Sequence, residues 1–449
     1  MIASIREFAD KKKPEGYYER LSNELEKLNS KLHIFSNINH QVTSGIPFSV
    51  KDNICVSGVE STASSAVLEG YVPPFDATPV GRLKSNGFAF IGKTKMDEFG
   101  FGTFGINCKD HPRNPFGDDY VTGGSSAGAA AAVSVMKYHI AVAESTGGSI
   151  SCPAAFCGVV GFTPTYGLVS RYGLIDYASS MDKIGVIGRS ACDVRYAFDI
   201  MKGSDSYDTT CVDHQINDEN KKKLIIIDQL MEGIDQDILS SFDRLISKMR
   251  NLGYSVEHRS LPLINKSLAA YYIISMAEAS TNLAKYTGFK YGLKISDFSK
   301  GYNDFFTEAR GGFGSEAKRR IILGTFVRSA SVKSRYYEKA LKFRHMLIDA
   351  LGDTLKDGFL ISPTMPIKTP TVNEVGGLDP LKSYSMDSIT VPPNLAGLPH
   401  ISFPCDYVNG FPVGAQLVTG HFNDYALLDF VEGWEEKFNY RFNYNVGAI

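Results

Sequence analysis

A chain of 449 residues has room for two or three domains, although large α/β proteins often build one sheet over this length. With 43% apolar and 21% charged residues, the composition excludes a disordered or fibrous chain. The formal net charge of −2 excludes an electrostatic basis for strong nucleic-acid binding by this chain alone.

Helices are predicted for the first forty residues. Between residues 15 and 32, leucines and a tyrosine recur at steps of three and four, as on one face of an amphipathic helix. Residues 45–51 then read as a turn that enters a short strand, and Lys51 falls at the end of that strand. A lysine in such a place is normally a surface residue.

A second strand is predicted over residues 88–91, inside a match to the phosphate-loop pattern GxxxxGK[ST] from Gly87 to Thr94. In a phosphate loop the four middle residues form a flexible loop with exposed N–H groups. Here these four residues are all apolar and are typical of a buried strand. We therefore interpret the match as a strand and not as a nucleotide site.

Two Gly-Gly-Ser turns occupy the centre of the chain. The first, Gly123-Gly124-Ser125, leads into an alanine-rich helix over residues 127–136, small enough on every side to pack closely beneath a sheet. A buried strand is predicted over residues 138–143. The second turn, Thr146-Gly147-Gly148-Ser149, opens at the carboxyl end of that strand, where α/β sheets usually bind ligands.

The remaining chain keeps alternating between strand and helix patterns, which favours one α/β sheet and one domain. Residues 265–352 read as almost wholly helical, with helices at 267–286 and 331–351 and a glycine-rich break at 311–314, and we expect them to cover the sheet. The other predicted elements are strands at 224–227, 254–256, 358–361, 401–403 and 413–417 and a helix at 235–249.

Seven scattered cysteines without a CxxC pair predict reduced thiols in a reducing compartment. No apolar run approaches the roughly 18 to 20 residues that span a bilayer. Residues 1–13 lack the apolar segment of a secretory signal. We therefore expect a cytoplasmic protein with no membrane contact.

The motifs favour a serine nucleophile that is activated without histidine. The elbow of a Ser-His-Asp hydrolase needs a closing glycine where Ser151 stands, and no spacing suggests a metal site, so no metal is expected. A lysine with a lowered pKa can serve as base, and a second serine can relay the proton because a hydroxyl both donates and accepts. Lys51, Ser125 and Ser149 supply the lysine and the two serines that this chemistry needs. Gly-Ser segments are also typical of flexible turns, so the spacing alone is weak support.

A series of motifs in order resembles the amidase signature family: residues 45–53, 92–99, 123–128, 146–150 and 153–161. The resemblance implies one α/β/α domain around a large mixed sheet over residues 1–449. Its parts would be N-terminal helices at 1–40, the signature core at 41–200, a helical cover at 265–352 and a return to the sheet at 355–449. It also accounts for the apparent phosphate loop as an ordinary family element.

The resemblance also implies roles. Ser149 is expected to be the nucleophile, Lys51 the general base, and Ser125, after an unusual cis peptide, the relay between them. The expected oxyanion hole consists of the backbone N–H groups around Thr146, Gly147 and Gly148.

Within the family, the chain is most similar to the A-type (glutaminase) subunits of amidotransferases that amidate Glu-tRNA(Gln) or Asp-tRNA(Asn). Residues 166–174, 178–182, 318–325 and 394–399 carry this similarity. It implies that the chain hydrolyses glutamine and passes ammonia to a B-type partner, beside a small C-type subunit. ATP and Mg²⁺ are expected at the partner and no cofactor in this chain.

Glutamine carries an α-carboxylate and an α-ammonium, so its pocket needs a fixed cation and a fixed anion. The resemblance implies that Arg320 binds the carboxylate, that Asp387 binds the ammonium, and that Tyr271 lines the same pocket. Taken alone, Arg320 is typical of a solvated helix face.

Two positions depart from the family pattern: Ser145 replaces the usual Asp and Ser151 the usual Arg. Our hypothesis is that relatives pair these charges and that this chain has neutralised both, because one charge left alone in the interior costs about 3–5 kcal/mol. Two other readings stay open: a stand-alone amidase for another small amide, and a structural subunit that has lost catalysis.

Overall fold

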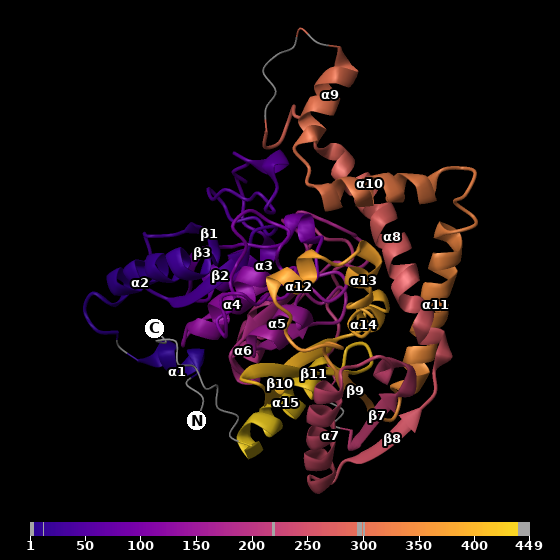
Figure 1. The fold of residues 1–449 in the computed structure, drawn as a ribbon. Helices are drawn as coiled ribbons and strands as arrows, with labels where there is room; N and C mark the ends of the chain where they lie inside the picture. Colours follow the sequence, from indigo (N-terminus) through magenta and orange to yellow (C-terminus); the bar gives the residue numbers. More distant parts are fainter. Residues whose placement is uncertain (1–3, 12, 218–220, 294–298, 300, 439–449) are drawn as a thin grey trace.

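One mixed sheet crosses the whole molecule in the computed structural model, which describes residues 4–11, 13–217, 221–293, 299 and 301–438 (Figure 1). The ends of the predicted regions 1–40 and 355–449, at residues 1–3 and 439–449, lie outside the described residues. In spatial order the strands are β1 (Phe35–Ile38), β3 (Phe88–Thr94), β2 (Ile46–Lys51), β4 (Ile140–Ser145), β6 (Lys183–Gly188), β5 (Val160–Thr163), β10 (His400–Val408), β11 (Phe411–Val418), β9 (Phe359–Pro363), β7 (Lys223–Ile227) and β8 (Ser255–Arg259).

The pairing of β5 with β10 joins the early and late strands into this one sheet. Ile401 of β10 lies opposite Phe162 of β5 in an antiparallel register. Around β2 and around β7 the strands run parallel, and the other neighbouring strands of the sheet run antiparallel. The predicted α/β class with a large mixed sheet is therefore confirmed.

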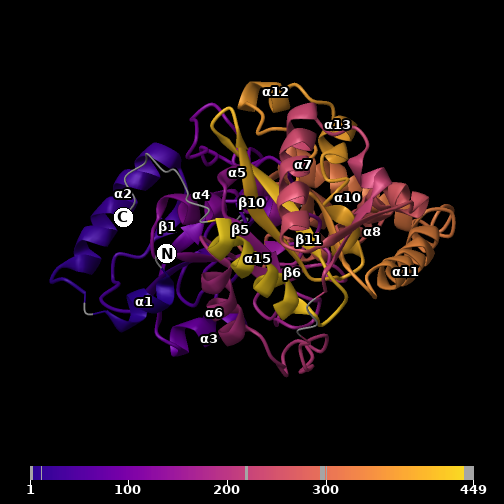
Figure 2. The same ribbon diagram turned by 90° about the horizontal axis from the view of Figure 1, so that it is seen from below.

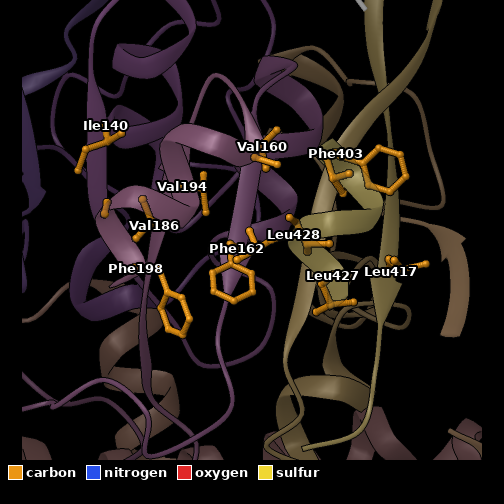
Figure 3. Close-up of a cluster of buried hydrophobic side chains, with 14 of the residues drawn as sticks. Ile140, Val160, Phe162, Val186, Val194, Phe198, Phe403, Leu417, Leu427 and Leu428 are labelled. Atoms are coloured by element: carbon orange, nitrogen blue, oxygen red, sulfur yellow. The ribbon is translucent and has the colours of Figure 1, made fainter. Parts of the chain in front are cut away.

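Helices cover both faces of the sheet because successive strand residues point to opposite sides. In β4, Ile140 and Val142 join the core beneath α3 (Thr78–Ser85), α6 (Ala191–Met201), α7 (Gln236–Asn251) and α15 (Asp424–Phe438). Ala141 and Ala143 join the core beneath α2 (Tyr17–Leu32), α4 (Ala127–Val135) and α5 (Ser151–Cys157). Figure 2 shows α6 and α15 lying across the first face, and Figure 3 shows part of its core, where Phe162 meets Phe198 edge to face. The result is the expected α/β/α arrangement.

The helices of the described residues are α1 (Ile5–Asp10), α2 (Tyr17–Leu32), α3 (Thr78–Ser85), α4 (Ala127–Val135), α5 (Ser151–Cys157), α6 (Ala191–Met201), α7 (Gln236–Asn251), α8 (Ser267–Asn282), α9 (Tyr302–Gly311), α10 (Ser315–Arg328), α11 (Tyr337–Thr354), α12 (Val372–Gly376), α13 (Pro380–Ser385), α14 (Val391–Leu395) and α15 (Asp424–Phe438). None of them combines the length and the apolar character needed to cross a membrane.

The helices of residues 265–352, among them α8, α10 and α11, form a group along one side of the molecule (Figure 1). Ile274 of α8 and Leu347 of α11 share a core with Leu360 of β9, so these helices pack against the sheet. The glycine-rich break separates α9 from α10 as predicted. Figure 1 shows α9 extending away from the body of the protein.

Three sequence predictions need correction. Residues 1–40 contain β1 besides two helices, because Phe35 pairs across the sheet with Thr94, a contact that local sequence does not reveal. The same sheet pairing extends β3 to Thr94, beyond the predicted end at residue 91. The helix predicted from residue 331 begins only at Tyr337, since the preceding residues form turns.

Candidate active site

Lys51 ends β2 in the interior of the sheet, with neighbouring strands on both sides. Its side chain is 0% exposed, and the apolar residues that alternate along β2 make this strand part of the core. The Lys51 Nζ donates to Ser125 Oγ at 2.8 Å, and to the carbonyl oxygen and Oε2 of Glu144, each at 2.9 Å. The predicted lysine is therefore a buried residue with three polar partners and not a surface residue.

Ser125 lies in the loop before α4, and the Gly124–Ser125 peptide bond is cis. A side chain at position 124 would overlap the carboxylate of Asp97, so this close approach requires glycine. Asp97 in turn accepts hydrogen bonds from the N–H groups of Gly105 and Asn107. The loop that carries Ser125 is thus fixed against its neighbours.

The two Gly-Gly-Ser turns meet in space. The N–H of Ser126 donates to the carbonyl oxygen of Ser149 at 3.2 Å, and Ser149 lies between the end of β4 and the start of α5. Ser149 is 7% exposed, whereas Ser125 is fully buried. The structure therefore brings Lys51, Ser125 and Ser149 into one region.

Backbone geometry explains the two glycines before Ser149. A Cβ atom at Gly147 would lie 2.5 Å from the hydroxyl oxygen of Tyr271, and one at Gly148 would overlap the side chain of Thr390. Within the described residues, the N–H groups of Gly147 and Gly148 have no hydrogen-bond acceptor. They are suited to bind an oxygen that carries negative charge.

Burial and the neighbouring acids shift the pKa of Lys51 in opposite directions. Burial lowers the pKa of Lys51, while the Glu144 carboxylate acts in the other direction, with smaller contributions from Asp97 and Asp182. Burial raises the pKa of Asp97 to about 7. Burial and the nearby Glu144 raise the pKa of Asp182 to about 8. The lowered pKa makes Lys51 better suited to act as a general base than a solvated lysine.

A cleft of about 350 Å³ contains Arg320. Arg320 is 3% exposed: its Nε donates to Glu316 Oε1 at 2.8 Å, and its guanidinium donates to the Tyr177 hydroxyl at 2.5 Å. The rings of Phe101 and Tyr384 also lie near the guanidinium. Arg320 is therefore a buried cation that hydrogen bonds fix inside a cleft. The prediction of a solvated helix face, which its sequence context suggested, is wrong.

Asp387 is hydrogen-bonded to a residue that lines this cleft. Its Oδ2 accepts from the Tyr272 hydroxyl at 2.7 Å and from the Thr103 hydroxyl at 3.1 Å, and Thr103 belongs to the cleft lining. The Tyr272 ring also lies 5.3 Å from the Arg320 guanidinium. Tyr272 thus connects the candidate anion with the candidate cation.

Tyr271 lies beside the Gly147 turn and does not line the cleft. Neither Ser149 nor Asp387 lines it. Because Tyr271 and Tyr272 are consecutive on α8, this helix places one tyrosine against the turn of Ser149 and the next against Asp387. Tyr271 therefore lies near the candidate nucleophile, and Tyr272 lies near the cleft.

Sequence reasoning missed Glu144, Asp182 and Tyr272. A signal for Glu144 was present: it is an acid in a strand whose preceding residues are apolar, and a buried acid needs a partner. Nothing in the local sequence indicates that Tyr272 contacts Asp387, since the two residues come from distant segments.

The two departures from the family pattern lie in the interior. Ser145 Oγ donates to Asn394 Oδ1 at 3.4 Å, and the hydroxyl of Ser151 is buried with no hydrogen-bond partner among the described residues. The loss of a charge pair at these positions stays a prediction.

Comparison with known proteins places this site in context. The sequence model of the family described as Amidase matches residues 17–428. The A subunit of glutamyl-tRNA(Gln) amidotransferase from Sulfolobus acidocaldarius is 38% identical, over 97% of this chain and 96% of the relative. The protein of the same name from Pseudothermotoga lettingae is 41% identical, over 89% of this chain and 87% of the relative.

Solved structures share the fold. The crystal structure of the A subunit of glutamyl-tRNA(Gln) amidotransferase from Thermotoga maritima superposes with a TM-score of 0.84 at 34% identity, covering 100% of this chain and 98% of that chain. Allophanate hydrolase of Kluyveromyces lactis reaches a TM-score of 0.83 at 23% identity, over 100% of this chain and 75% of that chain. At that identity the likeness concerns the fold alone.

Proposed function

This chain belongs to the amidase family, and on that premise we propose that it is the glutaminase subunit of a heteromeric tRNA-dependent amidotransferase. The observation that carries the proposal is the buried hydrogen bond from Lys51 to Ser125 beside the turn of Ser149. A buried lysine that contacts a serine has the means to remove a proton without histidine.

The proposed reaction starts with attack of Ser149 Oγ on the side-chain amide carbon of glutamine. The Ser149 proton passes to Ser125 Oγ, and the proton of Ser125 passes to Lys51 Nζ. The N–H groups of Thr146, Gly147 and Gly148 stabilise the negative oxygen that forms. The C–N bond then breaks, the nitrogen takes back a proton through the same relay, and ammonia leaves. Water attacks the resulting ester in the same way and releases glutamate.

Glutamine would be held by opposite charges. We assign its α-carboxylate to Arg320 and its α-ammonium to Asp387, because a buried guanidinium and a carboxylate form strong charged hydrogen bonds with these groups. Tyr271 lies against the turn that precedes Ser149, and we assign it to the lining of the glutamine site. A stand-alone amidase for an uncharged amide would have little use for a buried cation and an anion that share Tyr272 as a neighbour.

Amidation itself needs groups outside this chain. We propose that a B-type subunit binds ATP and Mg²⁺ and amidates Glu-tRNA(Gln) or Asp-tRNA(Asn), with a small C-type subunit beside it. The formal net charge of −2 on this chain agrees with tRNA contacts lying mainly on the partner. A complex that acts on charged tRNA works where translation takes place, so we expect it in the cytoplasm.

The test is ammonia release from glutamine by the purified chain, alone and together with its partner subunits and charged tRNA. We expect hydrolysis that Ser149→Ala abolishes without changing the melting temperature. Hydrolysis of simple amides with no preference for glutamine would favour the stand-alone amidase. A folded complex that transfers no amide nitrogen from glutamine would favour a structural subunit.

A further inference from the structure

Glu144 holds Lys51 through two different oxygens. Its carbonyl oxygen and its Oε2 each lie 2.9 Å from Lys51 Nζ, and the third neighbour of that nitrogen is Ser125 Oγ at 2.8 Å. The ion pair is almost completely enclosed, with 0% exposure of the lysine side chain and 1% of the glutamate side chain. Two of the three positions around the nitrogen therefore belong to one residue.

The three neighbours of the Lys51 nitrogen determine where its lone pair points when the lysine is neutral. A neutral amine has two N–H bonds and one lone pair, whereas an ammonium has three N–H bonds. A carbonyl oxygen and an ionised carboxylate only accept, so they take both N–H bonds of the amine. The lone pair then faces Ser125. The ammonium fits the same geometry, because it donates one hydrogen bond to each neighbour.

The carboxyl groups of Glu144 and Asp182 both contact the Thr146 hydroxyl. The Thr146 hydroxyl lies 2.6 Å from Glu144 Oε1 and 2.8 Å from Asp182 Oδ1, and it has only one hydrogen to donate. One of the two carboxyl groups must therefore carry a proton of its own if both contacts are hydrogen bonds.

That proton belongs on Asp182. Glu144 Oε2 accepts from Lys51 and from the side-chain amide of Asn53, at 3.1 Å, and both contacts favour the carboxylate form. Burial, and next the charge of Glu144, raise the pKa of Asp182 to about 8. We therefore assign the extra proton to Asp182, so that Glu144 accepts from Lys51, Asn53 and Thr146 as a carboxylate.

We propose that Glu144 is a positioning residue of the glutaminase reaction, whose two oxygens aim the lone pair of Lys51 at Ser125 and whose carboxylate stabilises the ammonium that forms. The inference rests on the proposed function for its physiological meaning. In the step concerned, the O–H bonds of Ser149 and Ser125 break in turn, and one new N–H bond forms on Lys51. The positive charge appears beside the Glu144 carboxylate. The other acids that act on Lys51 are Asp97 and Asp182.

The test uses Glu144→Gln in the full chain with its partner subunits. Gln removes the charge, and its NH₂ group competes with Ser125 for the lone pair of Lys51. The readout is the rate at which Ser149 reacts with phenylmethanesulfonyl fluoride as a function of pH, followed by peptide mass spectrometry. In this reaction the Ser149 oxygen forms a bond to sulfur, fluoride leaves and the serine proton passes to Lys51, so no glutamine is needed.

We expect two changes in Glu144→Gln. The midpoint of the acid limb moves to lower pH by at least about one unit, because the lysine loses the anion that favours its charged form. The plateau rate at high pH falls at least about tenfold, because the base is weaker and its lone pair is no longer aimed at Ser125. Glu144→Ala, which adds no competing donor, is expected to show the same pH shift with a smaller fall of the plateau.

Asp193→Asn is the matched control. Asp193 is a buried carboxylate on α6 that accepts from the N–H of Ile5 at 2.8 Å, and the change is the same replacement of oxygen by NH₂. It is expected to leave both the midpoint and the plateau unaltered.

An unshifted acid limb in folded Glu144→Gln overturns the inference, and so does loss of the cooperative melting transition in both Glu144 variants, which would make the residue purely structural. The proposed function fails separately: the wild-type complex would then release no ammonia from glutamine, whatever the pH dependence of Ser149.

Discussion

Replacing Asp387 by Asn tests two effects of this partly buried carboxylate. One is its cost to the stability of the fold, and the other is its contribution to glutamine binding. Both hydrogen bonds of Asp387, from Tyr272 and Thr103, end on Oδ2, so an Asn can keep them with its amide oxygen at that position. Burial raises the pKa of Asp387 from 3.8 to about 6. Each pKa unit is worth about 1.4 kcal/mol, and partial exposure reduces the total to about 1–2 kcal/mol.

The sign of this effect follows from proton binding. Between about pH 4 and pH 6 the native carboxyl binds its proton more tightly than the unfolded one, so ionisation lowers stability as the pH rises. The full penalty is present at pH 7. We therefore expect Asp387→Asn to raise the free energy of unfolding at pH 7 by about 1–2 kcal/mol, and the gain to vanish near pH 4. Urea denaturation of the complete chain at both pH values measures the difference.

The same variant should bind glutamine less well. Loss of a charged hydrogen bond to the α-ammonium costs about 1.5–3 kcal/mol, so KM rises about 10- to 100-fold with a smaller change in kcat. In the wild type, KM rises below about pH 6 as Asp387 takes up a proton. Asp193→Asn is the control and leaves KM unaltered. A KM that does not change in Asp387→Asn, or a variant less stable than the wild type at pH 7, refutes this reasoning.

Two further variants probe the turn and the cleft. Gly148→Ala places a Cβ atom 2.9 Å from the Cβ of Thr390, so we expect glutaminase activity to fall at least about 100-fold, whereas Gly352→Ala, where a Cβ meets nothing within 4 Å, leaves it unaltered. Arg320→Lys keeps the charge but loses the Nε hydrogen bond to Glu316 and the forked geometry proposed for the glutamine carboxylate, and KM is expected to rise about tenfold or more in steady-state assays. Wild-type activity in Gly148→Ala, or an unaltered KM in Arg320→Lys, would show that these groups do not act as assigned.

The sequence predicts the central elements of this fold because their patterns are local. Alternating apolar residues mark β2, a continuous apolar run marks β4 and small residues mark α4, so these elements and the two Gly-Gly-Ser turns could be located, although β4 begins and ends two residues later than predicted. The strand β1 escaped prediction because its four residues are held by pairing with β3, far along the chain. Boundaries such as the start of α11 depend on turns that periodicity does not resolve.

The candidate site likewise contains residues that the sequence could predict and residues that it could not. Lys51, Ser125 and Ser149 stand in recognisable motifs, and the structure joins Lys51 to Ser125 and places the turn of Ser149 beside the loop of Ser125. Partners that come from distant segments were not predictable: Tyr272 contacts Asp387 across more than a hundred residues, and Asp182 shares the Thr146 hydroxyl with Glu144. Such contacts follow from the sheet order and not from spacing.

The most direct test of the central claim is the covalent intermediate. The complex is mixed with glutamine, quenched in acid and digested, and the peptide that contains Ser149 is examined by mass spectrometry. We predict that this peptide gains the mass of one glutamyl group, and that the adduct is absent from Ser149→Ala. Continued release of ammonia by Ser149→Ala, or a glutamyl adduct on another residue, would contradict the account.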